Sequence, residues 1–157
     1  MWDKTISTLN TITKYVTAAL LILMTALIFV QIISRVLIGS SFSWTEELAR
    51  YLMIWITFLG AGFAFQYSAH MGIDYFVNKI SSTYSKLIMV IMAIASMFFF
   101  CFLFFQGIKL MEFGMMQKSS ALKIPMGYVY LIFPISSVLI LLNLIDVTKK
   151  QLKVSNS

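Results

Sequence analysis

The sequence predicts an all-α integral membrane protein with four transmembrane helices, preceded by a short N-terminal amphipathic helix. Of its 157 residues, 60% are hydrophobic and only 11% are charged, and the mean hydropathy of +0.89 lies far above that of soluble proteins. The apolar residues fall into four runs, each long enough to cross about 30 Å of hydrocarbon. We expect a single membrane domain over residues 1–157.

The N-terminal segment, residues 1–14, is polar and rich in threonine, but apolar side chains recur in it at helical spacing. These are Trp2, Ile6, Leu9 and Ile12. The pattern predicts an amphipathic interfacial helix on the membrane surface. A secretory signal peptide is the competing interpretation, and it fits poorly because the following apolar run is too long and no small-x-small cleavage site closes it.

The four spans are expected at residues 15–36, 44–67, 87–111 and 128–147. In the second span, Gly60 and Ala64 have the small-xxx-small spacing that lets another helix approach closely. In the polar loop expected at 68–86, His70 and Asp74 have the spacing of a helical metal-binding pair. Two ligands without a third make a poor site, so we expect no bound metal.

The basic residues at the ends of the spans predict the topology. Lys4, Lys14, Lys79, Lys86, Lys149, Lys150 and Lys153 lie on the side of the termini, and Arg35, Arg50, Lys109, Lys118 and Lys123 lie on the other. Seven against five favours both termini in the cytoplasm. Basic residues that flank apolar spans are expected to meet membrane lipid headgroups, and we expect no nucleic-acid binding.

Three charges gather at the start of the second span, where Glu46, Glu47 and Arg50 have the spacing of one helix face. Ser43 and Glu46 also match a capping box. Two interpretations stay open. The group is either a solvated helix terminus at the membrane boundary, or a fixed polar anchor that also neutralises Arg35, within the subunit or against another one.

The apolar cores of the spans contain no Asp, Glu, Lys, Arg or His; these cores are residues 15–34, 51–67, 87–108 and 128–145. Ion-coupled carriers place such groups near the bilayer midplane, so the chain has no visible transport site of its own. No set of catalytic side chains converges, and one histidine cannot supply paired haem ligands. We therefore expect neither an enzyme nor a cofactor, and a protein that acts through its surfaces.

Three segments carry a resemblance to a known family. Residues 43–51 read Ser-Trp-Thr-Glu-Glu-Leu-Ala-Arg-Tyr and run into the second span, Arg35 follows the first span, and residues 121–125 read Ala-Leu-Lys-Ile-Pro, where Pro125 is expected to precede the last helix. Together they resemble the small, Q-type membrane subunit of tripartite ATP-independent periplasmic (TRAP) transporters. The candidate motif and partner-interface residues are Arg35, Trp44, Glu46, Glu47, Arg50, Trp55, Gly60, Ala64 and Pro125.

The resemblance implies a multi-pass subunit of the bacterial inner membrane that binds a large M-type permease, which holds the sodium and substrate sites. A soluble periplasmic substrate-binding protein would deliver a carboxylate, such as a C4-dicarboxylate, a 2-keto acid or a sialic acid, for sodium symport. The small subunit would act as an accessory scaffold. The alternative from another class is a self-sufficient small channel or exporter that works as a homo-oligomer.

Overall fold

The computed structural model describes the backbone of residues 2–40, 42–77 and 82–154, and the side chains of residues 3–40, 42–66, 88 and 90–150. The described residues are almost entirely helical, as the sequence predicts. The elements in chain order are α1 (Trp2–Ile38), α2 (Ser43–Val77), α3 (Ser82–Met115), α4 (Gly127–Tyr130) and α5 (Ile132–Val154).

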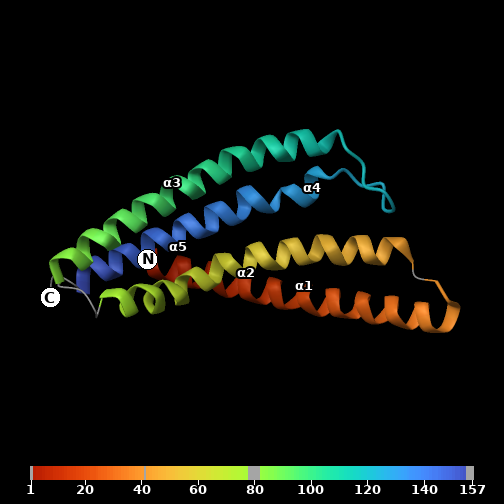
Figure 1. Cartoon of the computed structure of the whole chain (residues 1–157), viewed down its shortest axis with the longest axis horizontal. Coiled ribbons are helices and arrows are strands. Elements are labelled where there is room, and N and C mark those ends of the chain that lie inside the picture. The colour runs from red at the N-terminus through yellow and green to blue at the C-terminus, as the bar shows by residue number, and fades with distance from the viewer. Residues whose placement is uncertain (1, 41, 78–81, 155–157) are drawn as a thin grey trace.

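The helices form a bundle in which the order of packing differs from the order in the chain. α1 packs against α2, α2 packs against α5, and α5 packs against α3. Both termini lie toward one end of the bundle, and the connections after α1 and after α3 lie at the other end (Figure 1). Four stretches are long and apolar enough to span a membrane, namely 3–38, 43–66, 90–115 and 127–150, which confirms the four expected spans.

Two expected boundaries differ from the structure. Residues 2–38 form one uninterrupted helix, so no break separates an interfacial helix over residues 1–14 from the first span. Most of the loop expected over residues 68–86 is also helical, because α2 continues to Val77 and α3 begins at Ser82. The expected boundaries were placed where polar residues end the apolar runs of the sequence. Polar residues can nevertheless continue a helix where water solvates their side chains, so the helices extend beyond those runs.

The first helix is terminated by Gly39, the residue after its last turn, whose φ of +76° is the left-handed conformation that glycine adopts without a steric penalty. Its backbone N–H donates to the Arg35 carbonyl at 3.1 Å, which satisfies one of the free carbonyls at the end of α1. The chain can then reverse within a few residues and enter α2 at Ser43. This reversal places the end of α1 beside the start of α2.

The α5 helix is the centre of the bundle. Half of the residues in the most apolar stretch of residues 127–150, most of which form α5, are buried by the rest of the chain, against 6% in the corresponding stretches of α1 and α3. The apolar core joins Leu59 of α2 to Ile132 and Leu139 of α5. The Phe58 ring meets the Phe133 ring edge to face, with centroids 4.8 Å apart. The outer faces of α1 and α3 therefore remain apolar and uncovered by this chain.

Among the described glycines, the tightest contacts lie between α3 and the α4–α5 segment, and two of these glycines lie on one face of α3. A Cβ added to Gly107 would lie 2.9 Å from the Phe133 Cβ, and one added to Gly114 would lie 2.6 Å from Tyr130 Cδ2 and 2.9 Å from the Gly127 nitrogen. No helix of the described chain makes such a close approach at Gly60, so its contact with a helix of another subunit stays a prediction. A Cβ on Gly60 would meet nothing within 4 Å.

We expect Gly114→Ala to destabilise the chain by about 1–3 kcal/mol, because overpacking a tight contact forces backbone and ring shifts. Gly60→Ala is the matched control, and it should leave the stability of the isolated subunit unchanged or raise it by up to about 1 kcal/mol, because its added methyl group meets open space and alanine favours the helix. Thermal unfolding of the two purified variants in detergent measures the difference. Equal melting temperatures for both variants would contradict the packing described for α3.

Candidate functional site at the loop end of the bundle

The Glu47 carboxylate joins the start of α2 to the loop between α3 and α4. Its Oε2 accepts a hydrogen bond from the Ala121 backbone N–H at 2.6 Å, and its Oε1 accepts one from the Tyr51 hydroxyl at 2.7 Å. An ionised acceptor forms stronger hydrogen bonds than a neutral one, so the contact ties two segments that lie 74 positions apart. We call this contact the Glu47 clamp.

Loop 116–126 has a hairpin-like form. The Met126 N–H donates to the Gln117 carbonyl, and the Ser119 N–H donates to the Ile124 carbonyl, each at 2.9 Å. The Ser119 hydroxyl accepts from the Ile124 N–H at 3.2 Å. Lys123 has a φ of 57°, a left-handed conformation that is uncommon for residues other than glycine. The loop is therefore held in one specific shape by its own backbone and by the Glu47 clamp.

The other charges of the predicted anchor behave differently. Glu46 and Arg50 form an ion pair of 3.0 Å one turn apart on α2, and their side chains are 54% and 63% exposed. Arg35 takes part in none of the ion pairs of the described residues. The expected four-membered network is therefore divided into an exposed pair, a carboxylate used by the loop, and an unpaired arginine.

The predicted capping box at the start of α2 is also absent. None of the hydrogen bonds of the described side chains involves the Ser43 hydroxyl, and the Glu46 carboxylate turns toward Arg50. Instead, Thr45 binds the residue that precedes the helix. Its backbone N–H and its hydroxyl both donate to the Phe42 carbonyl, at 3.1 Å and 2.7 Å. Thr45 is fully buried. Its side chain therefore makes the hydrogen bond at the start of α2 that the sequence pattern assigned to Ser43.

The remaining candidate residues are spread over several surroundings. Trp44 is exposed near Phe42, with their ring centroids 6.4 Å apart. Trp55 packs against the apolar core, and Ala64 is partly buried. Pro125 pairs with Lys118 in an isolated bridge within the loop. The structure therefore brings Glu47 and the loop of Pro125 together, while Trp55 belongs to the core.

A second polar cluster, to which the sequence pattern assigns no role, crosses the bundle. Asn10 and Asn143 exchange hydrogen bonds of 2.7 and 2.9 Å between α1 and α5, and Asn10 also donates to Gln66 at 2.6 Å. The Asn143 amide donates to the Gly62 carbonyl at 2.8 Å. The two asparagines are 5% and 1% exposed, so the cluster fixes three helices from the inside. An amide inside an apolar run is the sequence signal that could have revealed it.

One turn beyond this cluster, an ion-paired group links the two termini. Lys150 Nζ lies 2.6 Å from Asp146 Oδ2 and 3.4 Å from Asp3 Oδ1. The Asp146 side chain is only 2% exposed, so it depends on the lysine for compensation of its charge. The contact with Asp3, whose side chain is 75% exposed, reaches the start of α1 but contributes little to stability.

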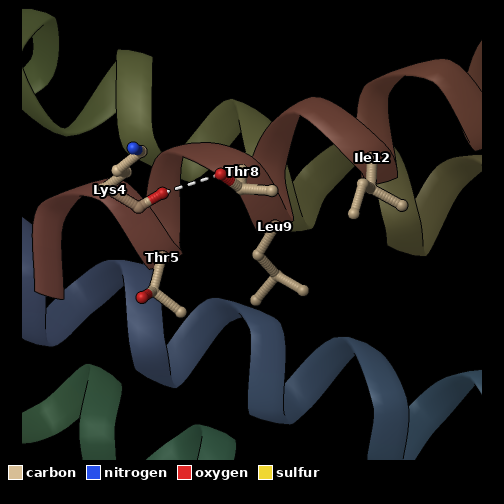
Figure 2. A pocket seen from close by; sticks show the side chains of 5 residues that line it. All are labelled: Lys4, Thr5, Thr8, Leu9 and Ile12. Carbon is tan, nitrogen blue, oxygen red and sulfur yellow. Dashed lines mark hydrogen bonds between the residues drawn. The ribbon is translucent and has the colours of Figure 1, made fainter. Parts of the chain in front are cut away.

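A shallow groove of about 450 Å³ lies along the start of α1, lined by Lys4, Thr5, Thr8, Leu9 and Ile12. Figure 2 shows the Lys4 nitrogen on the side of α1 opposite to Leu9, which points toward α5. The Thr8 hydroxyl donates to the Lys4 carbonyl at 2.9 Å. Among the described side chains, no three metal-ligating groups converge, and those of His70 and Asp74 lie outside the described set.

Comparison with known proteins decides the family. Residues 24–153 match the family described as the DctQ component of tripartite ATP-independent periplasmic transporters. The chain belongs to this family. As a DctQ component with four helices able to span a membrane, it is a multi-pass protein of the bacterial inner membrane, and the resemblance drawn from residues 43–51 and 121–125 is confirmed.

Three relatives support the assignment. The DctQ chain is 35% identical over 89 residues to a TRAP transporter small permease protein of Haemophilus influenzae, which covers 57% of the chain and 55% of that protein. It is 32% identical over 72 residues to the sialic acid TRAP transporter small permease protein SiaQ of Vibrio cholerae, covering 46% and 42%. It is 25% identical over 113 residues to the isethionate TRAP transporter permease protein DctMQ of Oleidesulfovibrio alaskensis, covering 71% and 18%. The chain thus spans about half or less of the length of these relatives.

We expect Glu47→Gln to release loop 116–126 in the DctQ chain, because the amide cannot offer two charged acceptor oxygens to Tyr51 and Ala121. Limited proteolysis should cut the loop of this variant several-fold faster than that of the wild type. Glu46→Gln is the matched control, and its exposed pair should contribute less than about 1 kcal/mol. Equal cleavage rates in both variants would contradict the Glu47 clamp.

We expect Asn143→Leu to destabilise the chain by about 1–3 kcal/mol, because it leaves the Asn10 side chain and the Gly62 carbonyl buried without their partner. The double variant Asn10→Leu/Asn143→Leu removes both amides and should recover part of that loss. Unfolding of the variants in detergent measures both effects. A double variant that loses the sum of the two single losses would show that the amides act independently.

Proposed function

We propose that this chain is the accessory scaffold subunit of a sodium-coupled importer of carboxylates. It stabilises a large M-type permease and works with a periplasmic substrate-binding protein. The observation that carries the proposal is the apolar outer surface of α1 and α3, because only 6% of the residues in the most apolar stretch of each helix are buried by the chain itself. In the bilayer, such a surface is available both to lipid and to the helices of a larger partner.

The relation to the DctMQ relative supports a large membrane partner. The matched region covers 71% of this chain but only 18% of that permease protein, so most of that protein lies outside the match. A small subunit that corresponds to a minor part of a longer permease fits an accessory role. The chain would contribute fixed helices beside a partner that moves the substrate.

The state of the buried polar groups argues against a transport site in this chain. Every buried side-chain nitrogen and oxygen of the described residues has a hydrogen-bond partner within the chain. The buried amides of Asn10 and Asn143 are hydrogen-bonded to each other. Asn10 also donates to Gln66, and Asn143 also donates to the Gly62 carbonyl. Coupling ions and anionic substrates need uncommitted ligands at membrane depth. We therefore assign the sodium and substrate sites to the permease partner.

We propose that both termini are cytoplasmic and that loop 116–126 faces the periplasm. The seven-to-five distribution of basic residues supports this orientation. At about 1.5 Å per residue, the 37 residues of α1 exceed the roughly 30 Å of hydrocarbon. The first turns of α1 would therefore extend straight through the cytoplasmic headgroups, where the sequence analysis expected a separate interfacial helix.

The proposed substrate is a carboxylate, of the C4-dicarboxylate, 2-keto acid or sialic acid type. The names of the relatives include one carboxylate, sialic acid, and one sulfonate, isethionate. Both are small organic anions, and an importer of anions gains from sodium symport because the cation offsets the charge that crosses the membrane. An uptake assay should therefore include both classes of anion.

The test is uptake by proteoliposomes that contain the permease, with the binding protein outside, in the presence and absence of this chain. We expect sodium-dependent uptake of a carboxylate that falls to background without the chain, and no movement of solute by the chain alone. Undiminished uptake in its absence would overturn the scaffold role. Solute movement by the chain alone would instead support the homo-oligomeric channel or exporter.

A further inference from the structure

We propose that loop 116–126 is a docking surface for an acidic patch on a soluble protein, and that Lys118 and Lys123 are its contact residues. The proposal rests on the proposed function, in which this end of the bundle faces the periplasm and the soluble partner is the substrate-binding protein. It deepens that function by assigning a place and a charge to the contact.

The loop lies outside the membrane-spanning stretches. The third apolar span ends at Met115 and the fourth begins at Gly127, so the segment between them is free to meet a soluble partner. It projects at the end of the bundle away from the two termini (Figure 1). A contact here would not compete with the apolar faces that lipid or a membrane partner covers.

The charge of the loop is unbalanced. Residues 116–126 contain two lysines and no acidic residue. Lys118 and Lys123 are both exposed, and neither belongs to the ion pairs of the described residues. The one carboxylate that touches the loop, that of Glu47, is used by the Ala121 N–H and the Tyr51 hydroxyl. Neither ammonium group is used in those ion pairs, and the loop lies beyond the ends of the spans, so the two lysines can reach acidic groups of another protein as well as the lipid headgroups expected near span ends.

The loop is also ordered before any partner arrives. The hydrogen bonds between Met126 and Gln117 and between Ser119 and Ile124 fix its two sides, and the Glu47 clamp fixes its middle. Lys123 is held at a φ of 57°, where a lysine is strained. A rigid surface loses little conformational entropy on binding, and paired opposite charges mainly accelerate the encounter. These are the properties that suit a partner that must bind and leave repeatedly.

The experiment measures uptake by the reconstituted complex as a function of the concentration of the binding protein. For Lys118→Glu/Lys123→Glu, we expect the half-saturating concentration to rise by about tenfold at low salt with an unchanged maximal rate. The effect should shrink at about 0.5 M salt, where charges are screened within a few ångströms. Lys123→Gly, which accepts the left-handed backbone and lacks the cation, should shift the value in the same direction.

The matched control is Lys4→Glu, which makes the same charge change at the opposite end of the bundle. An unchanged half-saturating concentration in the double loop variant, or an equal shift in the control, would overturn the docking surface. Lower recovery of the permease with the loop variants would also overturn it, because the lysines would then face the permease. Uptake that needs no copy of this chain would refute the proposed function itself, so the two failures are distinguishable.

Discussion

The hydrogen bond between the Ala121 N–H and the Glu47 carboxylate holds the loop end of this protein together. The loop between α3 and α4 leaves the helical ladder, so its backbone groups need other partners. The Glu47 clamp supplies charged acceptors from α2, a helix from the other half of the chain. Of the two neighbouring glutamates, Glu47 binds the loop, and Glu46 forms an exposed ion pair with Arg50. The shape of the loop, and with it the exposure of Lys118 and Lys123, depends on the contact made by Glu47.

At the opposite end of the bundle, near the termini, the main polar contacts are made by buried side chains. There, Asn10 and Asn143 pair inside the bundle, and Lys150 compensates the buried Asp146 while reaching Asp3 on α1. In both arrangements, the polar side chains bind to other groups of the same chain. A subunit with its polar side chains used in this way offers fixed surfaces to its partners, which is what a scaffold beside a moving permease requires.

The four spans could be predicted from the sequence because long apolar runs leave few alternatives in a bilayer. The helix ends could not, since α2 continues through the polar residues after 67 and α1 runs unbroken through residue 14. The charged cluster was located correctly, but its partners were not. Spacing along one helix pairs Glu46 with Arg50, yet nothing in it pairs Glu47 with Ala121. The tight packing at Gly114 could not be predicted either, because the residues that make the contact, Tyr130 and Gly127, lie on another segment of the chain.

The most direct test of the account is the exchange rate of the Ala121 amide proton, measured residue by residue in the protein in lipid nanodiscs. An amide in an open surface loop exchanges rapidly, whereas one that donates to a fixed carboxylate is protected until the contact opens. With the Glu47 clamp in place, we expect slow exchange at Ala121 that becomes fast in Glu47→Gln. Rapid exchange at Ala121 in the wild-type protein would contradict the clamp, and with it the fixed loop on which the docking surface depends.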